Sequence, residues 1–139
     1  MLKIASWNVN SIRARIVNFL DWVKEYNPDV VLLQELKCTI DQFPFLELES
    51  LNYNIEVLGQ KARNGVAILS KYPLYDIKKS LPLYNLINED EDSRFLEACF
   101  DYEGKTIKVV SVYLPNGGPT VAEVNSGIKD VTATETFRK

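Results

Sequence analysis

The sequence predicts a layered α/β or α+β fold, in which helices flank a mixed β-sheet. Two observations support this class. Residues 1–33 have the pattern of strand, helix and strand, and residues 53–114 have the pattern of successive strands joined by turns. Parallel strands need a long crossover such as a helix, whereas antiparallel strands can be joined by a short turn. We therefore expect one domain whose sheet contains both kinds of pairing.

Two strands are predicted near the start of the chain. Residues 2–9 carry apolar side chains on both faces, which indicates a strand inside a sheet. Residues 29–33 contain an unbroken apolar run directly after Pro28, which is typical of a strand buried on both faces. Glu35 follows this run, so its carboxylate should be held rigidly and either face a polar cleft or pair with a partner.

A helix is predicted between these two strands. Apolar residues recur at helical spacing from residue 12 to residue 23, with charged residues on the opposite side. Asn10 and Ser11 are the N-cap candidates, and the helix should end near Tyr26, before Pro28. Strand, helix and buried strand together form a βαβ-like opening.

The rest of the chain alternates between short elements and turns. We expect a short amphipathic helix within residues 43–51, strands at 53–58, 66–69 and 74–81, and a hairpin made of 94–102 and 106–114. The acidic residues 88–92 should form a solvated loop. Proline and glycine break the pattern after residue 114, and residues 119–139 are expected to be a loop-like tail or the start of another helix.

The composition excludes several kinds of site and location. The 139 residues include no histidine, so the chain itself supplies no histidine base or metal ligand. No apolar run approaches the roughly 18 residues of a membrane span, and no secretory signal pattern is present. The two cysteines lack metal-ligand spacing, which favours free thiols in a reducing cytoplasm. A net charge of −3 argues against a general basic footprint for nucleic acid, without excluding a local one.

Three polar residues stand at the carboxyl ends of predicted strands, namely Asn8, Glu35 and Tyr113. If these strands lie side by side, the residues converge at one rim, where open α/β sheets bind ligands. Mg²⁺ is bound through one or two carboxylates with waters and phosphate oxygens, so the set is a partial phosphoesterase site. The alternative is structural, because a glutamate or tyrosine at a strand end is commonly a surface or rim residue.

Five motifs in order resemble the exonuclease III family, the bacterial apurinic/apyrimidinic endonucleases of the endonuclease/exonuclease/phosphatase superfamily. The motifs are SWNVNSIRAR (6–15), PDVVLLQELK (28–37), NGVAILSKYP (64–73), RFLE (94–97) and SVYLPNG (111–117). The resemblance covers residues 1–118. The two arginines of the first motif are more similar to the DNA-repair branch than to the lipid or inositol phosphatases.

The resemblance implies a role for each site residue. Glu35 and Asn8 would form the metal site for Mg²⁺, with Mn²⁺ as an alternative ion. Tyr113 would be catalytic and contact the scissile phosphate. Substrate-binding positions would be Asn10, Arg13 and Asn116. The substrate would be double-stranded DNA with abasic sites or 3′ ends, hydrolysed by a reaction in which the metal neutralises developing charge.

The resemblance also implies that the family's fold is a four-layer α/β sandwich about twice as long. We expect residues 1–118 to be its N-terminal half. The family's Asp-x-Asn block, which carries the water-activating base, and its Ser-Asp-His block have no match here. Three alternatives stay open: a truncated DNA repair nuclease that is inactive or weakly active alone, a non-catalytic remnant or half-domain that needs a complementing C-terminal half, and a phosphatase of the same superfamily.

Overall fold

The computed structural model describes residues 1–80 and 92–114 and has the layered α/β architecture expected from the sequence. Its elements in chain order are β1 (Ile4–Asn8), α1 (Ile16–Tyr26), β2 (Val30–Gln34), the 3₁₀ helix η1 (Ile40–Gln42), α2 (Phe45–Glu49), β3 (Asn54–Leu58), β4 (Val66–Ser70), β5 (Tyr75–Lys78), β6 (Phe95–Tyr102) and β7 (Lys105–Val112). The expected tail at 119–139 and nearly all of the expected acidic loop lie outside the described residues.

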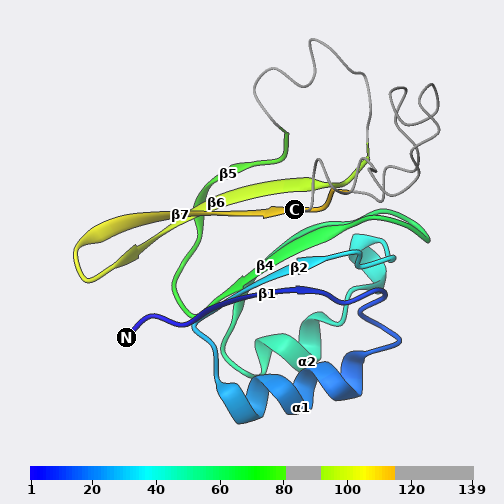
Figure 1. The fold of residues 1–139 in the computed structure, drawn as a ribbon, viewed down its shortest axis with the longest axis horizontal. Coiled ribbons are helices and arrows are strands. Elements are labelled where there is room, and N and C mark those ends of the chain that lie inside the picture. The colour runs from blue at the N-terminus through cyan, green and yellow to red at the C-terminus, as the bar shows by residue number, and fades with distance from the viewer. Residues whose placement is uncertain (81–91, 115–139) are drawn as a thin grey trace, which may run out of the picture.

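The seven strands of the described chain form two sheets (Figure 1). The first is the expected mixed sheet, in the order β1-β2-β4-β3, where β1 and β2 are parallel and the other pairs are antiparallel. The later strands form a second, antiparallel sheet in the order β5-β6-β7. Helices α1 and α2 cover one face of the first sheet, and the second sheet covers the other (Figure 1). The described chain therefore has three layers.

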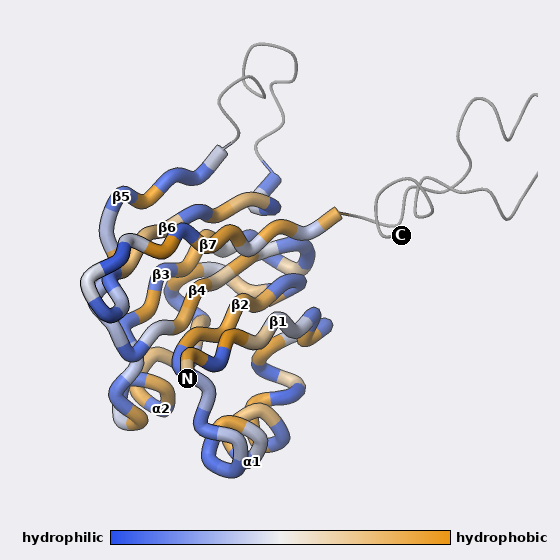
Figure 2. The backbone as a smooth tube through the Cα atoms, turned by 60° about the vertical axis from the view of Figure 1, so that its left-hand side comes forward, coloured by the Kyte–Doolittle hydropathy of each residue, from blue (hydrophilic) through white to orange (hydrophobic). Residues whose placement is uncertain are grey.

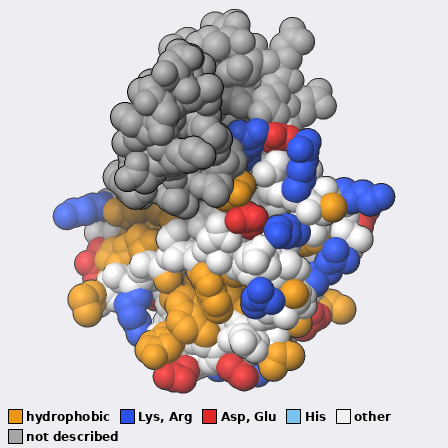
Figure 3. Space-filling model, turned by 45° about the vertical axis from the view of Figure 1, so that its right-hand side comes forward, with side chains coloured by type: hydrophobic (Ala, Val, Ile, Leu, Met, Phe, Trp, Pro, Cys, Tyr) orange, Lys and Arg blue, Asp and Glu red, His pale blue; other side chains and the backbone are white. Residues whose placement is uncertain are grey.

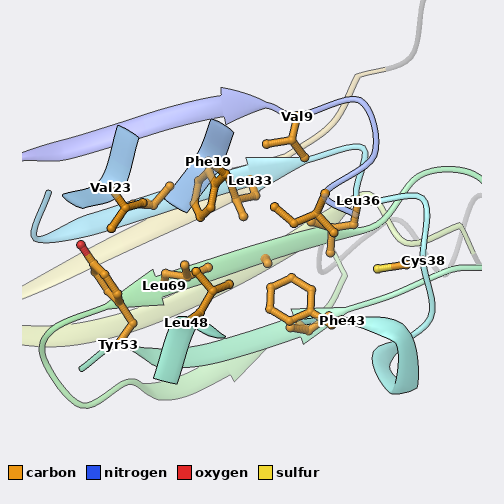
Figure 4. Packing of buried hydrophobic residues seen from close by; sticks show 14 residues of the cluster. Val9, Phe19, Val23, Leu33, Leu36, Cys38, Phe43, Leu48, Tyr53 and Leu69 are labelled. Atoms are coloured by element: carbon orange, nitrogen blue, oxygen red, sulfur yellow. The ribbon is translucent and has the colours of Figure 1, made fainter. Parts of the chain in front are cut away.

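Each interface between layers has its own hydrophobic core. Figure 4 shows Phe19 and Val23 of α1 pointing toward Leu33 of β2 and Leu69 of β4 in the core between helices and sheet. The second core joins the two sheets, and its buried members are Val30, Val66, Ile68, Leu96, Ala98, Phe100 and Val109.

None of the helices in the described residues combines the length and hydrophobicity that crossing a membrane requires.

Strand β2 contributes to both cores, as its unbroken apolar sequence predicts. Val31 and Leu33 pack toward the helices, whereas Val30 and Leu32 pack toward the second sheet. Hydrophobic residues dominate this central part of the first sheet along β2 and β4 (Figure 2). A strand buried on both faces has little freedom to shift, so the residue that follows it is held in a fixed place.

Helix α1 begins four residues later than the periodicity predicts. The amides of Ser11 and Ile12 bond the carbonyls of Glu35 and Leu36, and Asn10 and Ser11 have positive φ angles of 45° and 84°. Neither N-cap candidate caps the helix, because the N-cap is Arg15, and the Ser11 Oγ instead accepts a hydrogen bond from the Ala14 amide at 3.2 Å before the helix begins. A turn over residues 12–15 therefore precedes the helix. At the other end Asn27 adopts the left-handed conformation that ends many helices.

A hydrogen-bonded network of polar side chains, buried at Gln34 and Ser111, crosses the interface between the sheets. The Gln34 amide nitrogen donates to Ser6 Oγ and to Ser111 Oγ, each at 3.1 Å. The Ser111 hydroxyl in turn donates to the Leu33 carbonyl at 2.7 Å. Buried polar groups are normally satisfied in this way, because an unpaired one is strongly disfavoured. This hydrogen-bonded network joins β7 to β2 at one position.

We predict that Phe100→Ala destabilises the whole fold by about 3–5 kcal/mol, the usual effect of emptying a buried aromatic position. Phe100 is fully buried and stacks on Tyr72 with ring centroids 5.5 Å apart. Urea unfolding followed by circular dichroism measures the change. Leu46→Ala is the control, because Leu46 is 80% exposed and its loss should change stability by no more than about 0.5 kcal/mol. Equal effects of the two substitutions would contradict the packing described for the second core.

Ser111→Ala should destabilise by about 1–3 kcal/mol, because the Leu33 carbonyl and the Gln34 amide each lose a buried partner. The same unfolding measurement applies. Thr106→Ala on the same strand is the control, since its hydroxyl makes only exposed hydrogen bonds. A Ser111 variant as stable as the Thr106 variant would show that the hydrogen-bonded network contributes nothing to folding.

Candidate active site

The three polar strand-end residues meet on one carboxylate. Asn8 is the last residue of β1, and its Nδ2 donates to Glu35 Oε1 at 2.9 Å. The Tyr113 hydroxyl lies close enough to this carboxylate for Glu35 to raise the pKa of Tyr113. Glu35 follows β2 directly and is partly exposed, with 22% of its side chain accessible. Three segments that are far apart in the sequence thus converge at one end of the strands.

Tyr113 reaches this point from the other sheet. The residues were expected to share one rim if their strands lay side by side, but only β1 and β2 are neighbours, and β7 lies across the interface from them. The Tyr113 amide donates to the Arg94 carbonyl at 2.8 Å, which fixes the chain just after β7 ends. The site therefore lies at one end of the sandwich, between two sheets, and not along the rim of a single sheet.

Asn8 serves Glu35 through its amide nitrogen. Its Oδ1 accepts a hydrogen bond from the Asn10 amide at 3.1 Å, so the side chain is held from both ends. In this orientation Asn8 positions the carboxylate of Glu35, and its own oxygen is engaged by the backbone. Of the two metal residues expected from the sequence, Glu35 is the one that offers a carboxylate, with 22% of its side chain accessible.

A second group of site residues surrounds Lys37, which the sequence argument did not single out. Its Nζ lies 3.8 Å from Glu35 Oε2 and donates to Asn10 Oδ1 at 2.6 Å. Arg13 lies over the same loop, where its Nη2 donates to the Lys37 carbonyl at 3.4 Å. Lys37 stands only two residues after Glu35, so a search for cations near the predicted ligand could have found it. Asn116 lies outside the described residues.

The loop that carries Glu35 has an unusual backbone. Glu35 and Lys37 have φ angles of 55° and 56°, and Asn10 and Ser11 in the facing loop are also positive. Positive φ is uncommon for residues other than glycine, and such residues gather at functional sites, where the surrounding structure enforces them. Leu36, between Glu35 and Lys37, is fully buried and anchors the loop to the core. Holding Glu35 in this backbone conformation therefore lowers the stability of the fold.

The surroundings of Tyr113 keep its hydroxyl protonated. Burial raises the pKa of Tyr113, and the negative charge of Glu35 and the hydrogen bond to it raise this pKa further, while Arg94 opposes the shift. A neutral phenol is a hydrogen-bond donor, so at neutral pH Tyr113 can donate to an anionic oxygen placed beside Glu35. The group is suited to binding phosphate and is unsuited to acting as a base.

A further polar cluster flanks the site and had no signal in the sequence. Asp92 accepts hydrogen bonds from Gln60 and Arg63, and it forms an ion pair with Arg94. These residues come from the β3–β4 connection and from the segment before β6, and no spacing rule brings them together. Figure 3 views the molecule obliquely from the site end and shows basic and acidic side chains interspersed on the described surface. Any attraction for an anion at this end is therefore local.

Three comparisons identify relatives of this chain. Residues 5–130 match the model of the Endonuclease/Exonuclease/phosphatase family. Exodeoxyribonuclease III of Haemophilus influenzae is 33% identical over 129 residues, which are 93% of this chain and 47% of that protein. The DNA repair nuclease APEX1 of Danio rerio is 48% identical over 125 residues, which correspond to 83% of this chain and 36% of that protein. The chain thus spans less than half the length of these curated relatives.

Solved structures agree with these matches. An AP endonuclease from Archaeoglobus fulgidus superposes with a TM-score of 0.75 at 35% identity, over 86% of this chain and 43% of that one. A 3′-5′ exonuclease from Neisseria meningitidis gives 0.76 at 31% identity, over 99% and 52%. A 3′ phosphatase from Neisseria, solved with a product DNA hairpin, gives 0.78 at 30%, also over 99% and 52%. The fold, the ordered motifs and the family match agree, and the chain belongs to the endonuclease/exonuclease/phosphatase family.

Proposed function

We propose that this chain supplies the metal- and phosphate-binding part of a DNA repair nuclease site. The reaction would be hydrolysis of a DNA phosphodiester, either 5′ to an abasic site or at a 3′ end. The observation that carries the proposal is the convergence of Asn8 and Tyr113 on the Glu35 carboxylate. The relatives support this substrate class, because their names describe exodeoxyribonucleases and AP endonucleases.

The donor set fits a hard divalent cation such as Mg²⁺ or Mn²⁺. Mg²⁺ needs only one or two carboxylates when waters and phosphate oxygens complete its octahedral shell. Glu35 would hold the ion, and no group of three or more acidic, cysteine or histidine side chains that could form a fuller cage is found among the described residues. The bound ion would neutralise charge on the phosphate and on the leaving oxygen. Asn8 keeps the Glu35 carboxylate in place for it.

The neighbouring residues would bind the substrate. The Tyr113 hydroxyl would donate a hydrogen bond to a non-bridging phosphate oxygen, a contact of the kind that stabilises developing charge. Arg13 is exposed above the Glu35 loop and would pair with the DNA backbone. Asn10 would contact the substrate from the facing loop, and Asn116 is assigned by the resemblance alone.

Both cysteines are buried free thiols, which suits the cytoplasm.

A second candidate is that this chain is a half-domain completed by another polypeptide. Strand β1 is an edge strand of the first sheet. The Lys3 carbonyl just before β1 and the Val9 amide just after it hydrogen-bond the β2 segment. In parallel pairing the alternate residues therefore direct their backbone groups outward, and here these are Ile4, Ser6 and Asn8. All three side chains are exposed, and Ile4 is 44% accessible. An edge that no strand of residues 1–80 and 92–114 pairs with favours pairing with another strand.

We predict that Mg²⁺ strengthens the binding of a duplex containing an abasic-site analogue and that Glu35→Gln abolishes this metal dependence. Removing the carboxylate charge takes away the anionic ligand that Glu35 would offer to the ion. Fluorescence anisotropy with and without Mg²⁺ measures the effect. Glu25→Gln makes the same charge change on the exposed side of α1 and should behave like the wild type. Metal-dependent binding retained in the Glu35 variant would overturn the assignment.

The same variants test catalysis. Strand cleavage by the wild type that disappears in Glu35→Gln would rule out the non-catalytic alternative. Release of phosphate from a 3′-phosphate end, with abasic strands left intact, would favour the phosphatase of the same superfamily over the nuclease.

For the second candidate we expect a separately produced C-terminal half of the Haemophilus relative to raise cleavage by about 10²–10⁴-fold, the usual contribution of general acid–base catalysis. Ile4→Lys should prevent assembly by placing a charge at the open edge. Val17→Lys is the control, because Val17 is 66% exposed and belongs to α1, not to the edge strand. Sedimentation velocity measures assembly. Failure of the wild type to associate, or equal loss in both variants, would exclude completion along β1.

A further inference from the structure

The connection between β3 and β4 runs beside the Glu35 loop, and backbone hydrogen bonds join the two segments at more than one point. The Leu36 amide donates to the Gly65 carbonyl at 3.1 Å. Further along, the Gln60 amide donates to the Cys38 carbonyl at 2.9 Å. The end of the connection is thus bonded to the residue directly after Glu35, and its start is bonded two residues further on.

A glycine stands at each end of this connection, and both lie too close to the Glu35 loop to carry a side chain. A Cβ added at Gly65 would lie 2.9 Å from the Leu36 Cβ. One added at Gly59 would lie 2.7 Å from the Cys38 carbonyl oxygen. Carbon atoms that pack well are about 3.5–4.0 Å apart. Because Leu36 is fully buried and its Cβ is bonded to the backbone, a side chain at Gly65 would displace the backbone next to Glu35.

Ser93 bonds both glycines from the segment before β6. The Gly65 amide donates to the Ser93 carbonyl at 2.8 Å. The Ser93 Oγ donates to the Gly59 carbonyl at 2.9 Å. Ser93 is itself buried, so these hydrogen bonds are shielded from water and hold both ends of the connection in place.

The same contacts connect the Glu35 loop with Tyr113. Arg94 directly follows Ser93, and its carbonyl accepts a hydrogen bond from the Tyr113 amide at 2.8 Å. A series of backbone hydrogen bonds and covalent neighbours therefore runs from the Glu35 loop through Gly65 and Ser93 to the residue that carries the phenol. A shift at one end of this series is passed to the other end.

The alternative is that these glycines only permit dense packing. A substitution would then lower the stability of the fold and leave the geometry of the folded site unchanged. The placement of the glycines favours a positioning role, because both face the segment that follows Glu35 and neither lies within a core strand. Gly104, the remaining glycine of residues 1–80 and 92–114, has no atom within 4 Å of an added Cβ. Close contact is therefore particular to the two glycines beside the site.

We propose that the β3–β4 connection positions the Glu35 carboxylate relative to the Tyr113 hydroxyl. Gly59 and Gly65 allow the connection to lie against the Glu35 loop. Ser93 joins the connection to the segment that bonds Tyr113. These three are positioning residues, because they act on the site through the backbone. The inference rests on the proposed function for the ion that Glu35 would hold.

The side-chain amide of Asn8 reports the position of Glu35 without metal or DNA, because its Nδ2 donates to Glu35 Oε1. Gly65→Ala should shift the Asn8 side-chain resonances in a heteronuclear NMR spectrum. Gly104→Ala is the matched control, because φ is positive at both glycines, 93° and 77°, and only Gly65 is crowded. The control should leave the Asn8 resonances in place. Unchanged Asn8 resonances in folded Gly65→Ala would overturn the proposal.

Titration with Mg²⁺ alone, followed by the same NMR signals, separates this proposal from the proposed function. Gly65→Ala should weaken Mg²⁺ binding by about 10–100-fold, the usual effect of disturbing the groups that orient a metal ligand. Gly104→Ala should bind like the wild type. Equal Mg²⁺ affinity in the wild type and Gly65→Ala would overturn the positioning role and leave the proposed function intact. If the wild type binds no Mg²⁺, the proposed function fails, and the metal-free Asn8 shift decides the positioning role.

Ser93→Ala is a milder variant that decides the question if circular dichroism shows Gly65→Ala to be unfolded. It removes the hydrogen bond to the Gly59 carbonyl and adds no atom. Ser50→Ala is its control, because the Ser50 Oγ also donates to a backbone carbonyl, at 2.8 Å, at the end of α2. An Asn8 shift that appears in Ser93→Ala and not in Ser50→Ala supports the proposal. Identical Asn8 resonances in the two variants overturn it.

Discussion

The burial of β2 on both faces is the constraint on which the rest of the structure depends. Val31 and Leu33 are enclosed by the helices, and Val30 and Gln34 are enclosed by the second sheet. A strand held in this way cannot rotate or slip without exposing apolar surface on one side and leaving buried amides unpaired on the other. The chain leaves this strand at a fixed point, and the first side chain beyond it is Glu35. The other residues of the site are placed relative to Glu35.

The sequence was most informative where one residue pattern decides the local structure. The apolar run of β2 and the helical spacing of α1 were sufficient to predict those elements. The helix start was wrong by four residues, because residues 12–15 form a turn, and the amides of Ser11 and Ile12 bond the Glu35 loop. Periodicity contains no information about such contacts. The turn at Glu103 and Gly104 was predictable, since both residues adopt the positive φ that a tight hairpin requires.

The candidate site was predictable in part, for a similar reason. Polar residues at strand ends identified Asn8 and Glu35, whose strands are neighbours. Tyr113 was found by the same rule although its strand belongs to the other sheet, because the two sheets end on the same side. The cluster around Asp92 was not predictable, since it joins segments whose proximity depends on how the sheets pack. Long-range stacking of sheets is a tertiary property that no local pattern encodes.

The buried amide of Gln34 has a consequence for how the two sheets are aligned. An interface made only of aliphatic side chains permits small sliding movements, because its attraction is non-directional. A hydrogen bond of 3.1 Å from Gln34 to Ser111 is directional and tolerates little displacement. Ser111 lies on β7, two residues before Tyr113, and Gln34 immediately precedes Glu35. The Gln34 amide therefore fixes the alignment of the two sheets. This alignment sets the offset between the Tyr113 hydroxyl, which follows one sheet, and the Glu35 carboxylate, which follows the other.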